Sequence, residues 1–155
     1  MHAENKFEWC LKKGKEGGRG LKEIKPNIKE AKYHIKKALY NLKVTESNIE
    51  HGYSDWAVSS AFYAMYHAIL ALLYKFGYES TNQECSIATI EYFILTKKVN
   101  LDIKYIRMID PETENSIIKL REKFQYGTET KVSKEILQII RNNAKEFVEK
   151  FQEQI

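Results

Sequence analysis

The chain has 155 residues, 43% of them hydrophobic and 30% charged, which is enough for one domain with its own hydrophobic core. It contains only two prolines and seven glycines, so long stretches are free to form helices. Cys10 and Cys85 match neither a metal-binding spacing nor a CxxC motif, and we interpret them as ordinary buried or free thiols. The first ten residues lack the apolar segment of a signal peptide. These features predict a cytoplasmic protein with no metal and no cofactor.

The net charge of +4 is unevenly distributed along the chain. Residues 1–43 contain twelve Lys and Arg residues against five acids, whereas residues 44–120 are acidic. The basic N-terminal part is compatible with a phosphate-bearing partner. A solvated helix face is the simpler interpretation, because five of its lysines lie off the apolar stripe: Lys29, Lys32, Lys36, Lys37 and Lys43.

A short helix is expected first, over residues 3–13, followed by the glycine-rich segment GKEGGRG at 14–20. That segment lacks the GxxxxGK[ST] pattern of a phosphate loop, and we interpret it as a flexible hinge. Pro26 and Asn27 then open a second helix whose apolar residues follow heptad spacing as far as Ile49.

Residues 56–74 are nineteen residues without a charged side chain. They predict a central helix that starts after Ser54 or Asp55, either of which is a good N-cap, and stops at Gly77. Alanines recur along it with heptad spacing, and larger apolar residues follow the same spacing beside them. A membrane span is not favoured, because polar residues interrupt the run and the other helices need a central partner to cover their apolar stripes. This pattern is typical of the central helix of a bundle. Because the helix is too apolar for a lone four-helix monomer, it also predicts a homodimer.

Further helices are predicted after a capping box at Thr81, after Asp110-Pro111, and after the cap Ser133. Residues 99–109 are compatible with a short helix or a loop. No segment alternates like a β-strand, and there is no internal repeat. The sequence therefore predicts an all-α, antiparallel, up-and-down bundle of four to five helices, forming a single domain over residues 1–155.

Two passages of the chain carry a family resemblance. Residues 55–80, DWAVSSAFYAMYHAILALLYKFGYES, combine an aromatic-rich AxYYAMxHA-type segment with an apolar run that ends at a glycine. Residues 120–135, LREKFQYGTETKVSKE, form a late helix with an arginine-containing motif before the last helix. Both passages, and their order, resemble the HEPN family of helical nucleotide-associated domains. The resemblance extends from residue 20 to the C-terminus and is greatest to small single-domain prokaryotic members.

The resemblance implies an α-helical bundle that commonly forms a homodimer. In many HEPN members it also implies a metal-independent ribonuclease with an Arg-x(4–6)-His motif at the dimer interface. Many small members are toxins that pair with a separate minimal nucleotidyltransferase as antitoxin. A chain of this kind would also have RNA or a nucleotide as a partner.

The late motif departs from the family pattern at its most important position. Arg121 matches the arginine, but Tyr126 occupies the histidine position, and Glu122 follows the arginine. Arginine suits stabilisation of a phosphate charge, whereas tyrosine is a weaker base than histidine near neutral pH. Residues five apart on a helix differ by about 140° around its axis. Arg121 and Tyr126 would converge only at a frayed helix end or across a two-fold axis. In the alternative that we favour, both residues are structural: Arg121 pairs with a carboxylate and Tyr126 packs at the end of the bundle.

His67 is the alternative candidate for the missing base. It shares a polar line on the central helix with Ser60 and Tyr74. A buried histidine with a hydrogen-bond partner on a neighbouring helix is the more common situation, so we favour a structural role.

We therefore predict a binding module that contacts RNA or nucleotide through Arg121, Lys123, Gln125 and the basic N-terminal part. Its partner would be a minimal nucleotidyltransferase chain, in a toxin–antitoxin pair or a system derived from one. The first alternative is a metal-independent endoribonuclease with Arg121 and either Tyr126 or His67 as base. The second alternative is a non-catalytic dimeric scaffold.

Overall fold

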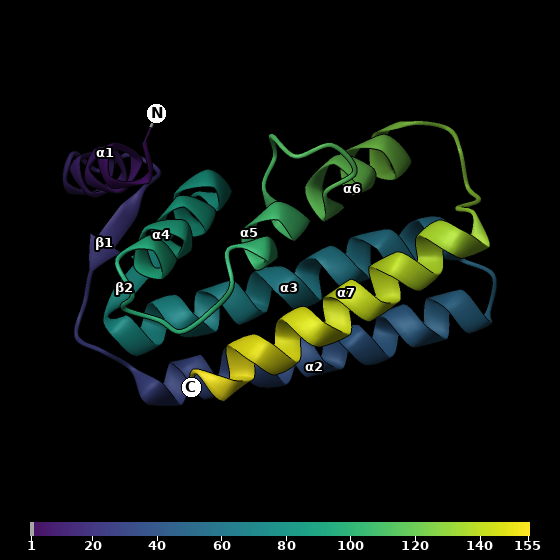
Figure 1. Cartoon of the computed structure of the whole chain (residues 1–155), viewed down its shortest axis with the longest axis horizontal. Helices are drawn as coiled ribbons and strands as arrows, with labels where there is room; N and C mark the ends of the chain where they lie inside the picture. Colours follow the sequence, from purple (N-terminus) through teal and green to yellow (C-terminus); the bar gives the residue numbers. More distant parts are fainter. Residues whose placement is uncertain (1) are drawn as a thin grey trace.

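A computed structural model describes residues 2–155 (Figure 1). Within this range there are seven α-helices and two short strands: α1 (Ala3–Lys15), β1 (Leu21–Glu23), α2 (Ile28–Glu50), α3 (Ser54–Phe76), β2 (Tyr78–Ser80), α4 (Gln83–Leu95), α5 (Lys104–Ile109), α6 (Ile117–Tyr126) and α7 (Lys134–Glu153). The long helices α2, α3 and α7 lie side by side, and the shorter helices α4, α5 and α6 cover the other side of α3 (Figure 1). The predicted all-α bundle is confirmed, with more helices than the four or five expected.

Helix α3 is the centre of the bundle. Its seam of alanines is completely buried: Ala57, Ala61, Ala64, Ala68 and Ala71. Ala31 and Ala38 on the buried side of α2 are also fully covered, so small residues meet small residues between the two helices. Short side chains let the two backbones approach closely, and α2 and α3 share the most extensive contact in the fold.

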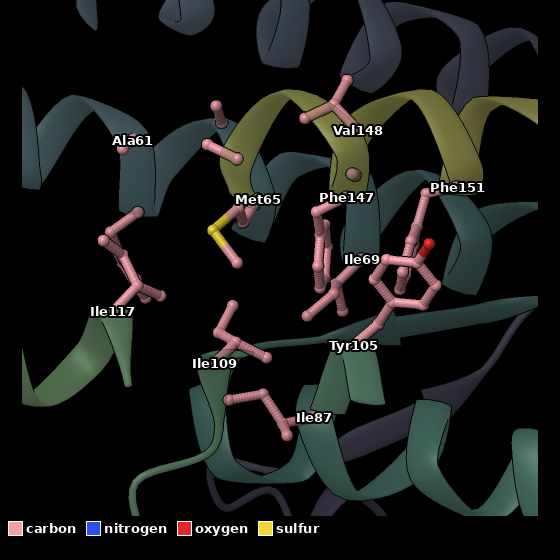
Figure 2. Packing of buried hydrophobic residues seen from close by; sticks show 14 of the residues in the cluster. Ala61, Met65, Ile69, Ile87, Tyr105, Ile109, Ile117, Phe147, Val148 and Phe151 are labelled. Carbon is pink, nitrogen blue, oxygen red and sulfur yellow. The ribbon is translucent and has the colours of Figure 1, made fainter. Parts of the chain in front are cut away.

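The larger apolar side chains of α3 form the main core. Met65 and Ile69 point toward Phe147 and Phe151 of α7 on one side and toward Ile109 of α5 on the other (Figure 2). Phe147 and Phe151 stack with ring centroids 4.1 Å apart. One helix in the described range, α3, is long and apolar enough to cross a membrane, but 72% of its apolar window is buried inside the fold. In this structure α3 is therefore a core helix.

A short antiparallel ladder corrects the expectation that the chain contains no strand. Leu21 of β1 pairs with Ser80 of β2, and Glu23 pairs with Tyr78. Strand β1 lies between α1 and α2, and β2 follows α3 after a single residue. Three-residue strands are too short to show an alternating pattern, so hydrophobic periodicity does not reveal them. The ladder fixes the segment between α1 and α2 against the end of α3.

The glycine-rich segment lies at the same end of the bundle. A side chain at Gly14 would collide with the carbonyl group of Leu21, and one at Gly20 would lie 2.5 Å from the carbonyl oxygen of Cys10. These two glycines thus allow the last turns of α1 to pack directly against the backbone of β1. A hinge function for residues 14–20 remains a prediction.

Two predicted helix starts are wrong. Helix α4 is capped by Asn82, whose side chain accepts a hydrogen bond from the Cys85 backbone at 3.0 Å. Thr81, the expected cap, instead accepts a hydrogen bond from the backbone N–H of Gly20 at 3.3 Å. Its hydroxyl therefore serves the neighbouring strand connection.

The second wrong start is Asp110-Pro111, because α6 begins only at Ile117, after the cap Ser116. The Asp110 carboxylate accepts hydrogen bonds from the backbone of Glu112 and Thr113, at 2.8 and 2.6 Å, within a turn. Asn115 then has a φ of 60°, a left-handed conformation that interrupts a right-handed helix. Asp110 satisfies the same donors as a helix cap without starting a helix.

The cysteines also differ from the prediction. Cys10 of α1 and Cys85 of α4 form a disulfide bond, and both are fully buried. The expectation of ordinary or free thiols is wrong, and the predicted cytoplasmic location loses one of its supports. Residues 75 apart in the sequence become neighbours only in the folded chain, so their spacing does not reveal the pairing. Phe7 of α1 stacks on Tyr92 of α4 beside the disulfide, with ring centroids 4.8 Å apart.

The first prediction concerns this disulfide. Replacing Cys10→Ser and Cys85→Ser together should lower the free energy of unfolding by about 4 kcal/mol, because a cross-link that closes a long loop restricts the unfolded chain. Urea denaturation of the wild type with and without dithiothreitol measures the same difference. Dithiothreitol should leave the double variant unchanged, and equal stability of the oxidised and reduced wild type would contradict the prediction.

Candidate functional site

Helix α6 positions the arginine of the late motif. Ile117, Leu120 and Phe124 are buried and anchor one side of this helix against α3. Arg121 lies next to this buried line and is only 9% exposed. The packing of α6 therefore holds a permanently charged side chain largely out of water.

The guanidinium group of Arg121 lies on aromatic rings. Its central carbon is 4.3 Å from the centre of the Phe62 ring and 5.9 Å from that of Tyr63, both on α3. One terminal nitrogen donates a hydrogen bond to the Gln125 side chain at 3.2 Å. These contacts fix the plane of the group, and cation–π attraction contributes to its stability.

The charge of Arg121 is nevertheless not neutralised. Its Nε atom is buried without a hydrogen-bond partner, and no carboxylate in residues 2–155 forms an ion pair with it. The described chain therefore does not show Arg121 in a structural ion pair with a carboxylate. Buried polar groups normally have partners, so an unpaired donor is unusual.

The other predicted contact residues of α6 are at the surface. Lys123 and Gln125 are exposed, and the Lys123 ammonium lies 5.3 Å from the centre of the Phe124 ring. Gln125 reaches back to Arg121, which places the hydrogen-bonded edge of the guanidinium close to solvent. The structure thus brings Arg121 and Gln125 together at the edge of the surface.

Tyr126 is not brought to Arg121. It is the last residue of α6 and is 74% exposed, whereas Arg121 is buried. Within one chain the two side chains therefore occupy different environments, as the five-residue spacing predicted. Tyr126 also does not pack into the end of the bundle.

His67 faces α2 and meets a residue that the sequence did not single out. Its Nδ1 atom is 2.9 Å from Nδ1 of His34, and the two rings stack with centroids 5.2 Å apart. Tyr74 stacks on His34, at 5.1 Å. His34 went unnoticed because it stands among lysines. Its place opposite His67 depends on the α2–α3 register, which only the folded chain shows.

Burial controls the protonation of this histidine pair. Burial lowers the pKa of His67 to about 4, assisted by the nearby His34 and Lys37. Burial also lowers the pKa of His34, although Glu30, 3.7 Å from its Nε2 atom, acts in the opposite direction. Both imidazoles are therefore mostly neutral near pH 7, and the Nδ1–H of one ring donates a hydrogen bond to the unprotonated Nδ1 of the other. This is a structural hydrogen bond, and a pKa so low makes His67 a weak base.

Two exposed aromatic side chains lie on one line of α3, and one of them contacts Arg121. Trp56 is 61% exposed and Tyr63 is 40% exposed, two helical turns apart on the same line. Tyr63 also contacts the guanidinium of Arg121. A stripe of aromatic rings beside a cation can stack on bases or on another protein surface.

Comparison with known proteins identifies the class. The chain is an all-α bundle with a buried arginine on a late helix, and the family model for the HEPN domain matches its residues 31–154. The chain belongs to the HEPN domain family, as its sequence resemblance predicted. No curated protein matches the chain. The match begins within α2, so α1 and β1 lie outside the matched range.

The second prediction follows from the histidine pair. His67 titrates near pH 4 in the folded chain but near 6.5 when unfolded. The unfolded chain therefore binds more protons between these values, and the free energy of unfolding should fall as the pH drops from 6.5 toward 4. Above pH 6.5 the pair should contribute no pH dependence.

Urea midpoints at several pH values measure this effect. The variant His34→Gln/His67→Gln should lose less stability on acidification than the wild type, with His2 and His51 unchanged in both. Comparing the two proteins removes the contribution of the carboxylates that they share. Identical pH profiles would contradict the prediction.

Proposed function

We propose that this chain is a nucleotide- or RNA-binding HEPN module in which Arg121 contacts phosphate. The observation that carries this proposal is the buried guanidinium of Arg121: within residues 2–155 its Nε has no hydrogen-bond partner and no carboxylate forms an ion pair with it. Burial of an uncompensated charge lowers stability, whereas a phosphate oxygen would satisfy both the charge and the free donor. Family membership supports a nucleotide- or RNA-related role.

The geometry favours binding over catalysis. Metal-independent RNA cleavage needs a base that accepts the 2′-hydroxyl proton near the group that stabilises the phosphate. Tyr126 is exposed while Arg121 is buried, and His67 is hydrogen-bonded to His34. An active endoribonuclease using either residue would need a second chain or a rearrangement to assemble the site. The binding module is therefore our conclusion, and endoribonuclease activity is the alternative that the next experiment tests.

The third prediction concerns Arg121. Arg121→Met keeps an unbranched side chain over Phe62 but removes the charge and the donors. It should weaken binding of a mixed tRNA and mRNA preparation at least about tenfold, consistent with the loss of a charge-assisted contact. Filter binding and cleavage are both measured in EDTA. Arg141→Met is the matched control, because Arg141 is exposed on α7 and pairs with Glu46.

The outcomes separate the two functions. Weaker binding in Arg121→Met, without cleavage by the wild type, supports the binding module. Cleavage by the wild type that disappears in Arg121→Met would establish the ribonuclease instead. RNA binding that Arg121→Met and Arg141→Met weaken equally would rule out Arg121 as a specific contact.

We further propose that the module pairs with a separate minimal nucleotidyltransferase, in a toxin–antitoxin system or one derived from it. Support for this partner comes from resemblance to small HEPN members alone. Co-expression with a nucleotidyltransferase encoded next to this chain, followed by affinity purification of the complex, tests it.

A homodimer is the remaining part of the proposal. The apolar length of α3, which first suggested dimerisation, is covered by the chain's own helices and no longer argues for it. The exposed line of Trp56 and Tyr63 supports it instead, since large exposed aromatic residues mark contact surfaces. A two-fold contact there would also bring two copies of Arg121 near one interface.

The fourth prediction tests this dimer. Trp56→Ser should shift the protein from dimer to monomer in sedimentation velocity, because an indole ring would leave the interface. Leu95→Ser, at the exposed end of α4, removes an apolar side chain of similar exposure and should leave the dimer intact. A wild-type monomer, or equal effects of both variants, would contradict the prediction.

A further inference from the structure

The solvent face of α2 carries an unusual concentration of positive charge. Within residues 29–43 there are five lysines and a single acid. Six side chains project within an arc of about 100° at 100° per residue. They are all exposed and form what we call the α2 basic face: Lys29, Lys32, Tyr33, Lys36, Tyr40 and Lys43.

None of these lysines is neutralised by the described chain. The ion pairs found in residues 2–155 do not include any lysine of the α2 basic face. The nearby acids face elsewhere, because Glu30 lies 3.7 Å from His34 and Glu46 pairs with Arg141 at 2.6 Å. The positive field of this face therefore extends into solvent.

The fold does not need this arrangement. Lys32 and Lys36 are four residues apart, and like charges at that spacing destabilise a helix by a few tenths of a kcal/mol. Alternating acids and lysines would make an equally soluble helix with favourable pairs. The α2 basic face thus has a small cost in stability that folding does not explain.

Two tyrosines interrupt the lysines. Tyr33 is 51% exposed and Tyr40 is 59% exposed, and the Lys37 ammonium lies 5.5 Å from the centre of the Tyr40 ring. Cations interleaved with accessible rings suit a nucleic-acid strand, whose phosphates meet the cations while its bases stack on the rings. We propose that the α2 basic face binds the phosphodiester backbone of an RNA strand without sequence preference.

This inference rests on the proposed function and adds a second contact surface to it. Arg121 is on α6, which packs on α3, whereas α2 packs on α3 and α7. Helix α3 thus lies between the two surfaces, so each can be altered separately.

A lipid surface fits this face less well. A helix that lies in a membrane interface inserts an apolar side. The apolar side of α2, including Ala31, Ile35 and Ala38, is buried in the fold. No aliphatic residue belongs to the α2 basic face. We therefore expect RNA binding, and the experiment below distinguishes it from membrane binding.

The fifth prediction is quantitative. Fluorescence anisotropy with a labelled mixed-sequence single-stranded RNA gives the dissociation constant at several salt concentrations. The variant Lys32→Gln/Lys36→Gln/Lys43→Gln should flatten the slope of log affinity against log salt by about 2, since each lost phosphate contact removes about 0.7 on a single strand. Circular dichroism checks that these exposed substitutions leave the fold intact.

The matched control is Lys97→Gln/Lys134→Gln/Lys145→Gln. Its three lysines are exposed after the end of α4 and on α7, outside the basic N-terminal part and α6, and it changes the net charge by the same amount. It should leave the salt slope unchanged. A separate variant, Tyr33→Ala/Tyr40→Ala, should weaken binding without changing the slope, because stacking involves no counterion release.

Each outcome decides something. If the two lysine variants change the salt slope equally, or if neither changes it, the α2 basic face is not an RNA-binding surface. If Arg121→Met weakens binding and the α2 variant does not, the inference fails while the proposed function stands. If the α2 variant weakens binding and Arg121→Met does not, the α2 basic face is supported and Arg121 is excluded as an RNA contact. No RNA binding by the wild type would overturn both. If the triple-lysine variant of α2 loses binding to phosphatidylserine vesicles but keeps the RNA affinity of the wild type, the α2 basic face binds lipid and the inference is wrong.

Discussion

The contact between α2 and α3 is the constraint on which the rest of this structure depends. Buried alanines along α3 meet Ala31 and Ala38 of α2, so the two long helices pack closely through small side chains. The bulky side of α3 is then turned toward α4, α5, α6 and α7, which build the core around it (Figure 2). The same register aligns His34 with His67 and leaves the lysines of α2 facing solvent. One packing choice thus places both the core and the charged surface.

The N-terminal segment is attached to this bundle in a different way. The HEPN match starts at residue 31, after α1 and β1. Helix α1 buries only Cys10 and Gly14 completely, and it is held on α4 by a disulfide, by Phe7 and by close backbone contacts at two glycines. Such a small apolar contact would hold a short helix weakly without the covalent bond. We therefore expect reduction of the disulfide to weaken the attachment of α1 to α4.

The sequence predicted the helices where periodicity and caps agree. Asn27 and Ser133 cap α2 and α7 as expected, and Gly77 ends α3 in a left-handed conformation. Sequence-based prediction failed where the partner of a polar side chain is distant in the chain. Thr81 is engaged by Gly20, and Cys10 by Cys85. Asp110 failed for a local reason, since an Asp-Pro turn and a helix cap use the same donors. For the site, the sequence identified Arg121 and His67 as candidates. Only the α2–α3 register reveals that His34 is the hydrogen-bond partner of His67.

The candidate site residues differ in how completely the fold explains them. His67 has a hydrogen-bonded partner and a protonation state that suits burial, so structure alone accounts for it. Tyr126 is exposed and needs no structural explanation. Arg121 is different, because stability would favour an apolar residue packed on Phe62 or a carboxylate beside the guanidinium, and residues 2–155 supply neither. Packing alone therefore does not account for this charge, which is why our proposal for phosphate binding rests on Arg121.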